Sequence, residues 1–206
     1  MSPAELSSSE AERLRAFERQ GHDALATSYH AFFAAVTALA TNPLLDAVRL
    51  RPATRLLDVA TGPGALAAVA ASRGARPVGT DLSPQMIELA RRLHPAIDFR
   101  EADVEHLPFS DHAFDVVVCA FGLGHFPQPE AAVAECVRTL LPGGHIALSW
   151  WDDSSRQRIQ GIIQWTEFAG RVQSRLRPTA DLIVRGGIHH SRSPHHERRR
   201  PCAIGS

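Results

Sequence analysis

The stretch Leu56-Leu57-Asp58-Val59-Ala60-Thr61-Gly62-Pro63-Gly64-Ala65-Leu66 decides the fold of this chain. An apolar run ends in small residues and a glycine-rich turn, and the alanine-rich residues 65–71 predict a helix. Strand, tight glycine turn and helix in this order place a ligand between the end of a buried strand and the start of a helix. Pro63 removes an amide donor, which makes the turn less suited to wrapping phosphates. The acidic Asp58 suits a ligand with a cationic group.

Four more apolar segments predict strands that alternate with helices. The predicted strands cover residues 76–81, 97–101, 114–120 and 145–151. The continuous β-branched run over 114–120 is typical of a parallel strand buried on both faces. One helix is predicted to begin at Pro84 with Ser83 as its N-cap, and another covers residues 129–141. The expected fold is α/β, a Rossmann-like, doubly wound and mainly parallel sheet.

Four motifs in this region resemble those of the class I S-adenosylmethionine-dependent methyltransferases. The opening stretch is similar to motif I, with Ala60 in place of the first glycine, and Val78–Met86 resembles motif II. Residues 102–109 resemble motif III, and Arg138-Thr139-Leu140-Leu141-Pro142-Gly143-Gly144 matches the signature ahead of the fifth strand. The resemblance is closest to the ubiquinone/menaquinone-biosynthesis-like family (methyltransferase type 11), whose members modify small molecules.

The resemblance implies S-adenosyl-L-methionine as the cofactor and S-adenosyl-L-homocysteine as the product. Asp81, at a strand tip, is placed to accept hydrogen bonds from both ribose hydroxyls. By resemblance, Asp103 accepts from the adenine amine and the Val104 amide donates to a ring nitrogen. The predicted cofactor-binding residues are Tyr29, Asp58, Ala60, Thr61, Gly62, Gly64, Asp81, Leu82, Met86, Asp103, Val104 and Ala120. Tyr29 is expected to cap the methionine end, or else to be one more core aromatic of its helix.

Methyl transfer chiefly requires that the acceptor is aligned with the S–CH₃ bond and that water is excluded. If the acceptor must lose a proton, His125, in the loop after the fourth strand, is the best-placed base, because its ordinary pKa is near neutrality. A purely structural role for His125 is the alternative. No metal is expected in the site.

Three regions are expected along the chain. Residues 1–52 form a helical cap over the cofactor site, residues 53–166 form the cofactor-binding core, and residues 167–206 form an atypical, poorly ordered tail. Apolar spacing over residues 10–40 predicts helix, the pair Asn42-Pro43 predicts a break, and residues 44–50 predict a short helix.

The regular pattern is lost toward the C-terminus. A helix is expected from Gln157 to about Trp165, and afterwards Leu182–Val184 is the only short strand candidate. The closing antiparallel hairpin of the fold is therefore predicted to be missing or altered, with the fifth strand left as an unprotected edge. The His/Arg-rich end, Gly186 to Ser206, has three competing interpretations: paired histidines that bind a metal, arginines 198–200 that contact nucleic acid, or a frameshift, which we favour.

Composition narrows the function classes. The 206 residues carry a formal net charge of zero, which gives no global electrostatic case for binding nucleic acid or an anionic membrane. No apolar run has the length of a membrane span, and the N-terminus does not resemble a secretory signal. The three cysteines lack metal or redox spacing. A cytoplasmic location is expected.

The sequence thus predicts methyl transfer to a small-molecule acceptor, by O-, N- or C-methylation. A methyltransferase remnant that only binds the cofactor is an alternative, because of the unusual C-terminus. An NAD(P)-dependent oxidoreductase would share the turn and Asp81 but would leave Asp58, the Asp103-Val104 pair and the proline-glycine-glycine signature unexplained.

Overall fold

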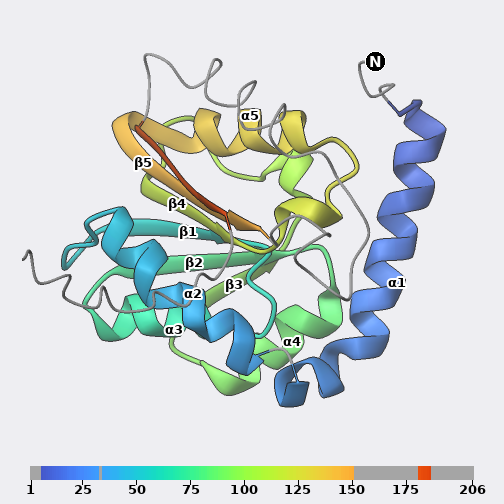
Figure 1. The fold of residues 1–206 in the computed structure, drawn as a ribbon, viewed down its shortest axis with the longest axis horizontal. Coiled ribbons are helices and arrows are strands. Elements are labelled where there is room, and N and C mark those ends of the chain that lie inside the picture. Colours follow the sequence, from blue (N-terminus) through green and yellow to red (C-terminus); the bar gives the residue numbers. More distant parts are fainter. Residues whose placement is uncertain (1–5, 33, 151–180, 187–206) are drawn as a thin grey trace, which may run out of the picture.

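The computed structural model describes residues 6–32, 34–150 and 181–186, with the side chains of residues 25, 27–32, 34–36 and 181–186 outside that description. Six parallel strands form one sheet in the order β3-β2-β1-β4-β5-β6 (Figure 1). The strands are β1 (Arg55–Val59), β2 (Arg76–Asp81), β3 (Asp98–Glu101), β4 (Phe114–Ala120), β5 (Leu140–Trp150) and β6 (Asp181–Gly186). The predicted doubly wound parallel fold is confirmed.

Seven helical segments connect or precede these strands in the described part of the chain. They are α1 (Ser8–Phe32), α2 (Ala34–Ala47), α3 (Ala65–Ser72), α4 (Pro84–Leu93), the short 3₁₀ helices η1 (Val104–His106) and η2 (Leu123–His125), and α5 (Pro129–Thr139). The predicted N-cap of α4 is confirmed, since the Met86 amide donates to Ser83 Oγ at 3.1 Å. No described helix combines the length and the apolarity that crossing a bilayer requires.

Neighbouring residues of the central strands face opposite layers, because side chains alternate along a strand. Leu57 and Val117 pack with α5, whereas Leu56 and Val116 pack with α2 and α3. All four side chains are at most 3% exposed. Helices therefore cover both faces of the sheet, and ligand access is left to the strand ends.

The order of the strands places a switch point between β1 and β4. The chain moves outward from β1 through β2 to β3 and then returns to the other side of β1. Loops at the carboxyl ends of β1 and β4 therefore diverge, which leaves a crevice there. Helix α1 runs along this end of the sheet (Figure 1).

The N-terminal region differs from prediction at one residue. Pro43 does not end a helix but lies inside α2. A proline removes one helical hydrogen bond, but Leu44 and Leu45, at 2% and 0% exposed, and Val48 just beyond the helix anchor this segment against the sheet. Packing outweighs the local preference for a break.

The C-terminal edge also differs from prediction. β6 contains the candidate Leu182–Val184 and pairs with β5 in parallel, so the expectation that β5 is an unprotected edge is wrong. Our prediction looked for two strands joined by a hairpin, but a parallel strand needs no partner that is adjacent in sequence. The expected helix from Gln157, and the histidine and arginine clusters after Gly186, lie outside the described residues.

A glycine in β2 should be intolerant of any side chain. A Cβ added to Gly79 would lie 2.5 Å from the Phe99 ring and 2.9 Å from Thr61 Oγ1, and Phe99 is only 2% exposed. We expect Gly79→Ala to lower the free energy of unfolding by about 1–3 kcal/mol, since a packed core cannot give way freely. Urea denaturation measures this.

Gly21 provides the matched control, because a Cβ there would meet nothing within 4 Å and the residue lies inside α1. We expect Gly21→Ala to raise the free energy of unfolding by about 0.5–1 kcal/mol through helix propensity. Equal stability of the Gly79→Ala variant and the wild type would contradict the packing of β2 against Phe99.

Candidate active site

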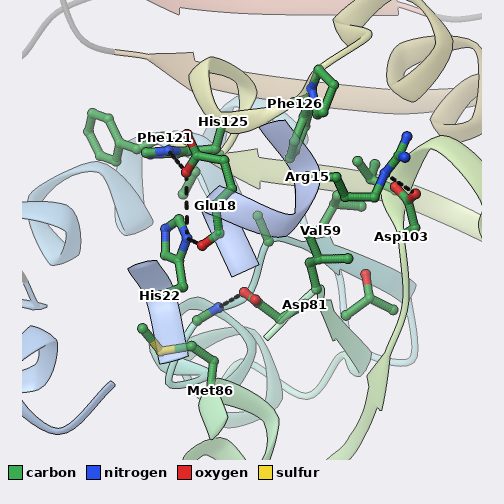
Figure 2. Close-up of a pocket in the computed structure, with 18 residues that line it drawn as sticks. Arg15, Glu18, His22, Val59, Asp81, Met86, Asp103, Phe121, His125 and Phe126 are labelled. Atoms are coloured by element: carbon green, nitrogen blue, oxygen red, sulfur yellow. Dashed lines mark hydrogen bonds and ion pairs between the residues drawn. The ribbon is translucent and has the colours of Figure 1, made fainter. Parts of the chain in front are cut away.

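A pocket of about 200 Å³ lies at the carboxyl ends of β1, β2 and β4, with α1 on its outer side (Figure 2). It is lined by Arg15, Glu18, His22, Val59, Ala60, Gly62, Thr80, Asp81, Leu82, Met86, Asp103, Val104, Ala120, Phe121, Gly122, His125, Phe126 and Pro127. Its position matches the switch point of the sheet, where open α/β folds bind their ligands.

The turn after β1 has an unusual backbone. Ala60, Gly62 and Gly64 have φ values of 53°, 52° and 83°, all in the left-handed region. Glycine adopts this region without cost, but alanine does so at about 1–2 kcal/mol. Phe121, at the end of β4, shows the same feature with φ of 60°. Two strained residues thus line the pocket, as is typical of ligand sites.

Asp58 lies beneath the pocket rather than on its surface. Asp58 is only 1% exposed, and Thr61 Oγ1 donates to Asp58 Oδ2 at 2.6 Å. Burial raises the pKa of Asp58 to about 7, although the hydrogen bonds from Thr61 and the Ala67 amide act in the opposite direction. Asp58 therefore acts on the site through the turn that it holds.

Asp81 is the acid that faces the pocket directly. The Gly62 amide donates to its Oδ2 and the Ser83 amide to its Oδ1, each at 2.9 Å. Burial raises the pKa of Asp81, whereas the two amides and the nearby His22 and His125 lower it. The carboxylate is fixed by two backbone donors and keeps lone pairs for a ligand in the pocket.

Asp103 caps η1, where its Oδ1 accepts from the Glu105 amide at 2.9 Å. Its second oxygen lies 2.7 Å from Arg15 Nε of α1. Arg15 also contacts Glu105, whose carboxylate accepts from the Gln128 amide at 2.6 Å. Asp103 thus lines the pocket, and one cation from α1 holds it in place.

Glu18, His22 and His125 form a cluster at the other end of the pocket (Figure 2). His125 Nδ1 lies 2.9 Å from Glu18 Oε2, and the His22 and His125 rings meet edge to face with centroids 4.9 Å apart. Burial raises the pKa of Glu18, but the hydrogen bond from His125 and the charges of both histidines lower it more. One ligand atom from each residue lies within 4.8 Å of the others, which makes this cluster the candidate metal site of the described residues.

The structure brings most of the predicted binding residues to this one pocket. Those that line it are Ala60, Gly62, Asp81, Leu82, Met86, Asp103, Val104, Ala120 and His125. Asp58, Thr61 and Gly64 support the turn without lining the pocket. Tyr29 lies in α1, but its side chain is outside the described part of the structure.

Sequence reasoning missed the residues that α1 contributes. Arg15, Glu18 and His22 are spaced three and four apart, so they share one face of the helix. Our interpretation followed the apolar spacing of Leu14 and Phe17, which are 36% and 70% exposed. The polar face covers the pocket, and its spacing was the signal available in the sequence.

Comparisons with known proteins agree with this arrangement. Residues 57–148 match the methyltransferase domain family. The chain is 45% identical over 100 residues to the demethylmenaquinone methyltransferase of Thermus thermophilus, covering 46% of each protein. It is 35% identical over 141 residues to an uncharacterized protein of Mycobacterium tuberculosis, covering 66% of this chain and 46% of that one.

Among solved structures, a SAM-dependent methyltransferase from Aquifex aeolicus matches with a TM-score of 0.56 and 17% identity. The match covers 66% of this chain and 77% of that one, and it shows the fold alone. The chain spans about half the length of the curated relatives it matches.

The doubly wound sheet, with its pocket at the switch point and an acid at the tip of β2, defines a Rossmann-like α/β protein. More narrowly, residues 57–148 match the methyltransferase domain family, which supports assignment of this region to the class I S-adenosylmethionine-dependent methyltransferases.

Proposed function

We propose that this chain transfers the methyl group of S-adenosylmethionine to a small-molecule acceptor. The single observation that carries the proposal is Asp81. Two backbone amides fix its carboxylate at the tip of β2, where it faces the pocket. A fixed carboxylate at this position suits the two hydroxyls of a ribose.

The other residues of the pocket fit the remaining parts of this cofactor. Val104, the neighbour of Asp103 in the chain, offers apolar surface for an adenine ring, with the acid available to its amine, and Met86 adds apolar surface to the lining elsewhere. The backbone around Ala60 and Ala120 would contact the methionine end of the cofactor. Burial raises the pKa of Asp58 and of Asp81, so a ligand that carries positive charge should favour the ionised form of both acids.

When bound, the cofactor supplies a methyl group already activated by a sulfonium. The residues of this chain then have to orient the acceptor and exclude water, and alignment alone can supply roughly 7–11 kcal/mol of the barrier. Helix α1 contributes to both tasks, because Arg15 and Glu18 line the outer side of the pocket. We propose His125 as the base that removes a proton from the acceptor.

Isothermal titration calorimetry tests the cofactor. We expect binding of S-adenosylmethionine and S-adenosylhomocysteine, and no binding of NAD under the same conditions. Binding of NAD alone would instead favour an oxidoreductase and would contradict the proposal.

A methyl-transfer assay tests the activity. A short-chain demethylmenaquinol is the first acceptor to use, because relatives that are up to 45% identical are demethylmenaquinone methyltransferases. Catechols and small amines extend the set of acceptors. Cofactor binding without transfer to any of these acceptors would favour the remnant that only binds the cofactor.

A further inference from the structure

Glu18 and His125 lie 107 positions apart in the sequence. Glu18 lies on α1, which precedes the sheet, and His125 ends η2, which follows β4. Their side chains meet at 2.9 Å between Glu18 Oε2 and His125 Nδ1 (Figure 2). This distance is that of a charge-assisted hydrogen bond.

The position of Glu18 is fixed by contacts on both sides of it along α1. Before it, Arg15 pairs with Asp103, and after it, Arg19 Nη2 lies 2.8 Å from Glu101 Oε1. Farther along, Ser83 Oγ donates to Asp23 Oδ1 at 2.5 Å. The helix is thereby bound to the ends of β2 and β3, and Glu18 has little freedom to leave the pocket.

We propose that Glu18 is a positioning residue that holds His125 in the form required of a base, with the proton on Nδ1 and Nε2 free for the acceptor. A carboxylate beside Nδ1 selects this tautomer and stabilises the imidazolium that forms during transfer. The inference rests on the proposed methyl transfer and adds to it the group that orients the base.

The dyad restricts the class of acceptor. An acceptor O–H or acidic C–H gives its proton to His125 Nε2, and the electron pair left on that oxygen or carbon forms the new bond to the methyl carbon. The S–CH₃ bond breaks with its electron pair on sulfur, which leaves a neutral thioether. Acceptors without a proton to lose, such as tertiary amines and thioethers, would gain nothing from the dyad.

The surroundings favour a hydrogen-bonded dyad over a metal site. His125 Nδ1 lies 2.9 Å from Glu18 Oε2, within hydrogen-bond distance, whereas His22 Nδ1 is 3.7 Å from that oxygen and lies 2.8 Å from the Glu18 carbonyl oxygen instead. The charged and titratable groups near His125 are Glu18 and His22 from α1 and Asp81 from β2. Of these three described groups, only His22 can carry a positive charge.

Nitrogen-15 NMR of the histidine rings tests the inference without any acceptor. With the His125 signals assigned by comparison with His125→Asn, we expect the neutral wild-type ring to carry its proton on Nδ1. In Glu18→Ala the population should shift toward the Nε2-protonated form, whereas Glu12→Ala, an exposed glutamate of the same helix, should leave the signals unchanged. An Nε2-protonated wild-type ring, or identical signals in Glu18→Ala, would overturn the inference.

Kinetics with an acceptor that the wild type methylates give a second readout. We expect Glu18→Gln to lower kcat about 100-fold, within the range of general-base catalysis, with the KM for S-adenosylmethionine changed less than about twofold. The pH profile of kcat should change in this variant but not in Glu12→Gln. Loss of wild-type activity in a chelator, restored by Zn²⁺, would replace the dyad with a metal site.

The two proposals fail separately. If the wild type binds no S-adenosylmethionine, the proposed function fails whatever the NMR result. If it binds and transfers methyl groups but Glu18→Gln has wild-type kcat and pH profile, only the positioning role is lost. Retained cofactor binding by Glu18→Gln, measured by calorimetry, shows that the variant is folded.

Discussion

Asp81→Asn is expected to weaken the binding of S-adenosylmethionine by about 100-fold. The carboxylate is the group that we propose to accept both ribose hydroxyls, and hydrogen bonds to a charged group contribute about 1.5–3 kcal/mol each. An asparagine offers only one oxygen, and its NH₂ would face a backbone N–H that now donates to the acid. Loss of about 2.7 kcal/mol corresponds to the expected factor of 100.

Calorimetry with S-adenosylhomocysteine measures the effect without turnover. Asp98→Asn is the matched control, because Asp98 begins the neighbouring strand β3 but pairs with Arg100 at the surface, outside the pocket. We expect its affinity to equal that of the wild type. Affinity of Asp81→Asn within about threefold of the wild type would show that the ribose does not lie on β2.

The core of the fold could be predicted from local sequence. β2 and β4 were predicted at their observed bounds, because β4 is a continuous apolar run and β2 is a short segment that ends in an acid just ahead of the N-cap of a helix. The structure differs from the prediction where contacts between residues far apart in the sequence determine the secondary structure. Pro43 lies within a helix because its neighbours are buried, and β6 exists as a strand because β5 offers an edge to pair with.

The candidate site was predictable on the side built by the sheet and not on the side built by α1. Asp81 ends a strand and Asp103 and His125 each follow one, so their meeting at one edge follows from the topology. Nothing local specifies that Glu18 meets His125, since the contact depends on how α1 crosses the strand ends. Long helices that pack across a site carry their functional residues on a polar face, which sequence patterns assign to solvent.

Stability without cofactor is expected to fall as pH rises from about 5 to 8, and Asp58 should be a main cause. The unfolded carboxyl titrates near 3.8, but burial raises the pKa of Asp58 in the folded state to about 7. Between these values the folded state holds a proton that the unfolded state has lost, so raising the pH favours unfolding. The shift of roughly three pKa units corresponds to at most about 4 kcal/mol, lost progressively up to pH 7.

Asp58→Asn should remove this part of the pH dependence. Asparagine stays neutral at every pH, so its free energy of unfolding should fall less than that of the wild type between pH 5 and pH 8, by a few kcal/mol. The variant pays a constant loss of about 1–3 kcal/mol, because one oxygen cannot accept from both Thr61 and the Ala67 amide. It should therefore gain stability relative to the wild type as the pH rises, and be equally or more stable at pH 8.

Urea denaturation of both proteins at the two pH values gives a double difference in which the histidines and all other titrating groups cancel. Asp115→Asn is the control: Arg55 lowers the pKa of Asp115 below its usual value, so this carboxyl is fully ionised in both states throughout the window. Its slope with pH should match that of the wild type. If Asp58→Asn also keeps the wild-type slope, Asp58 is ionised in the folded protein, and a negative charge rather than a proton lies beneath the turn of β1.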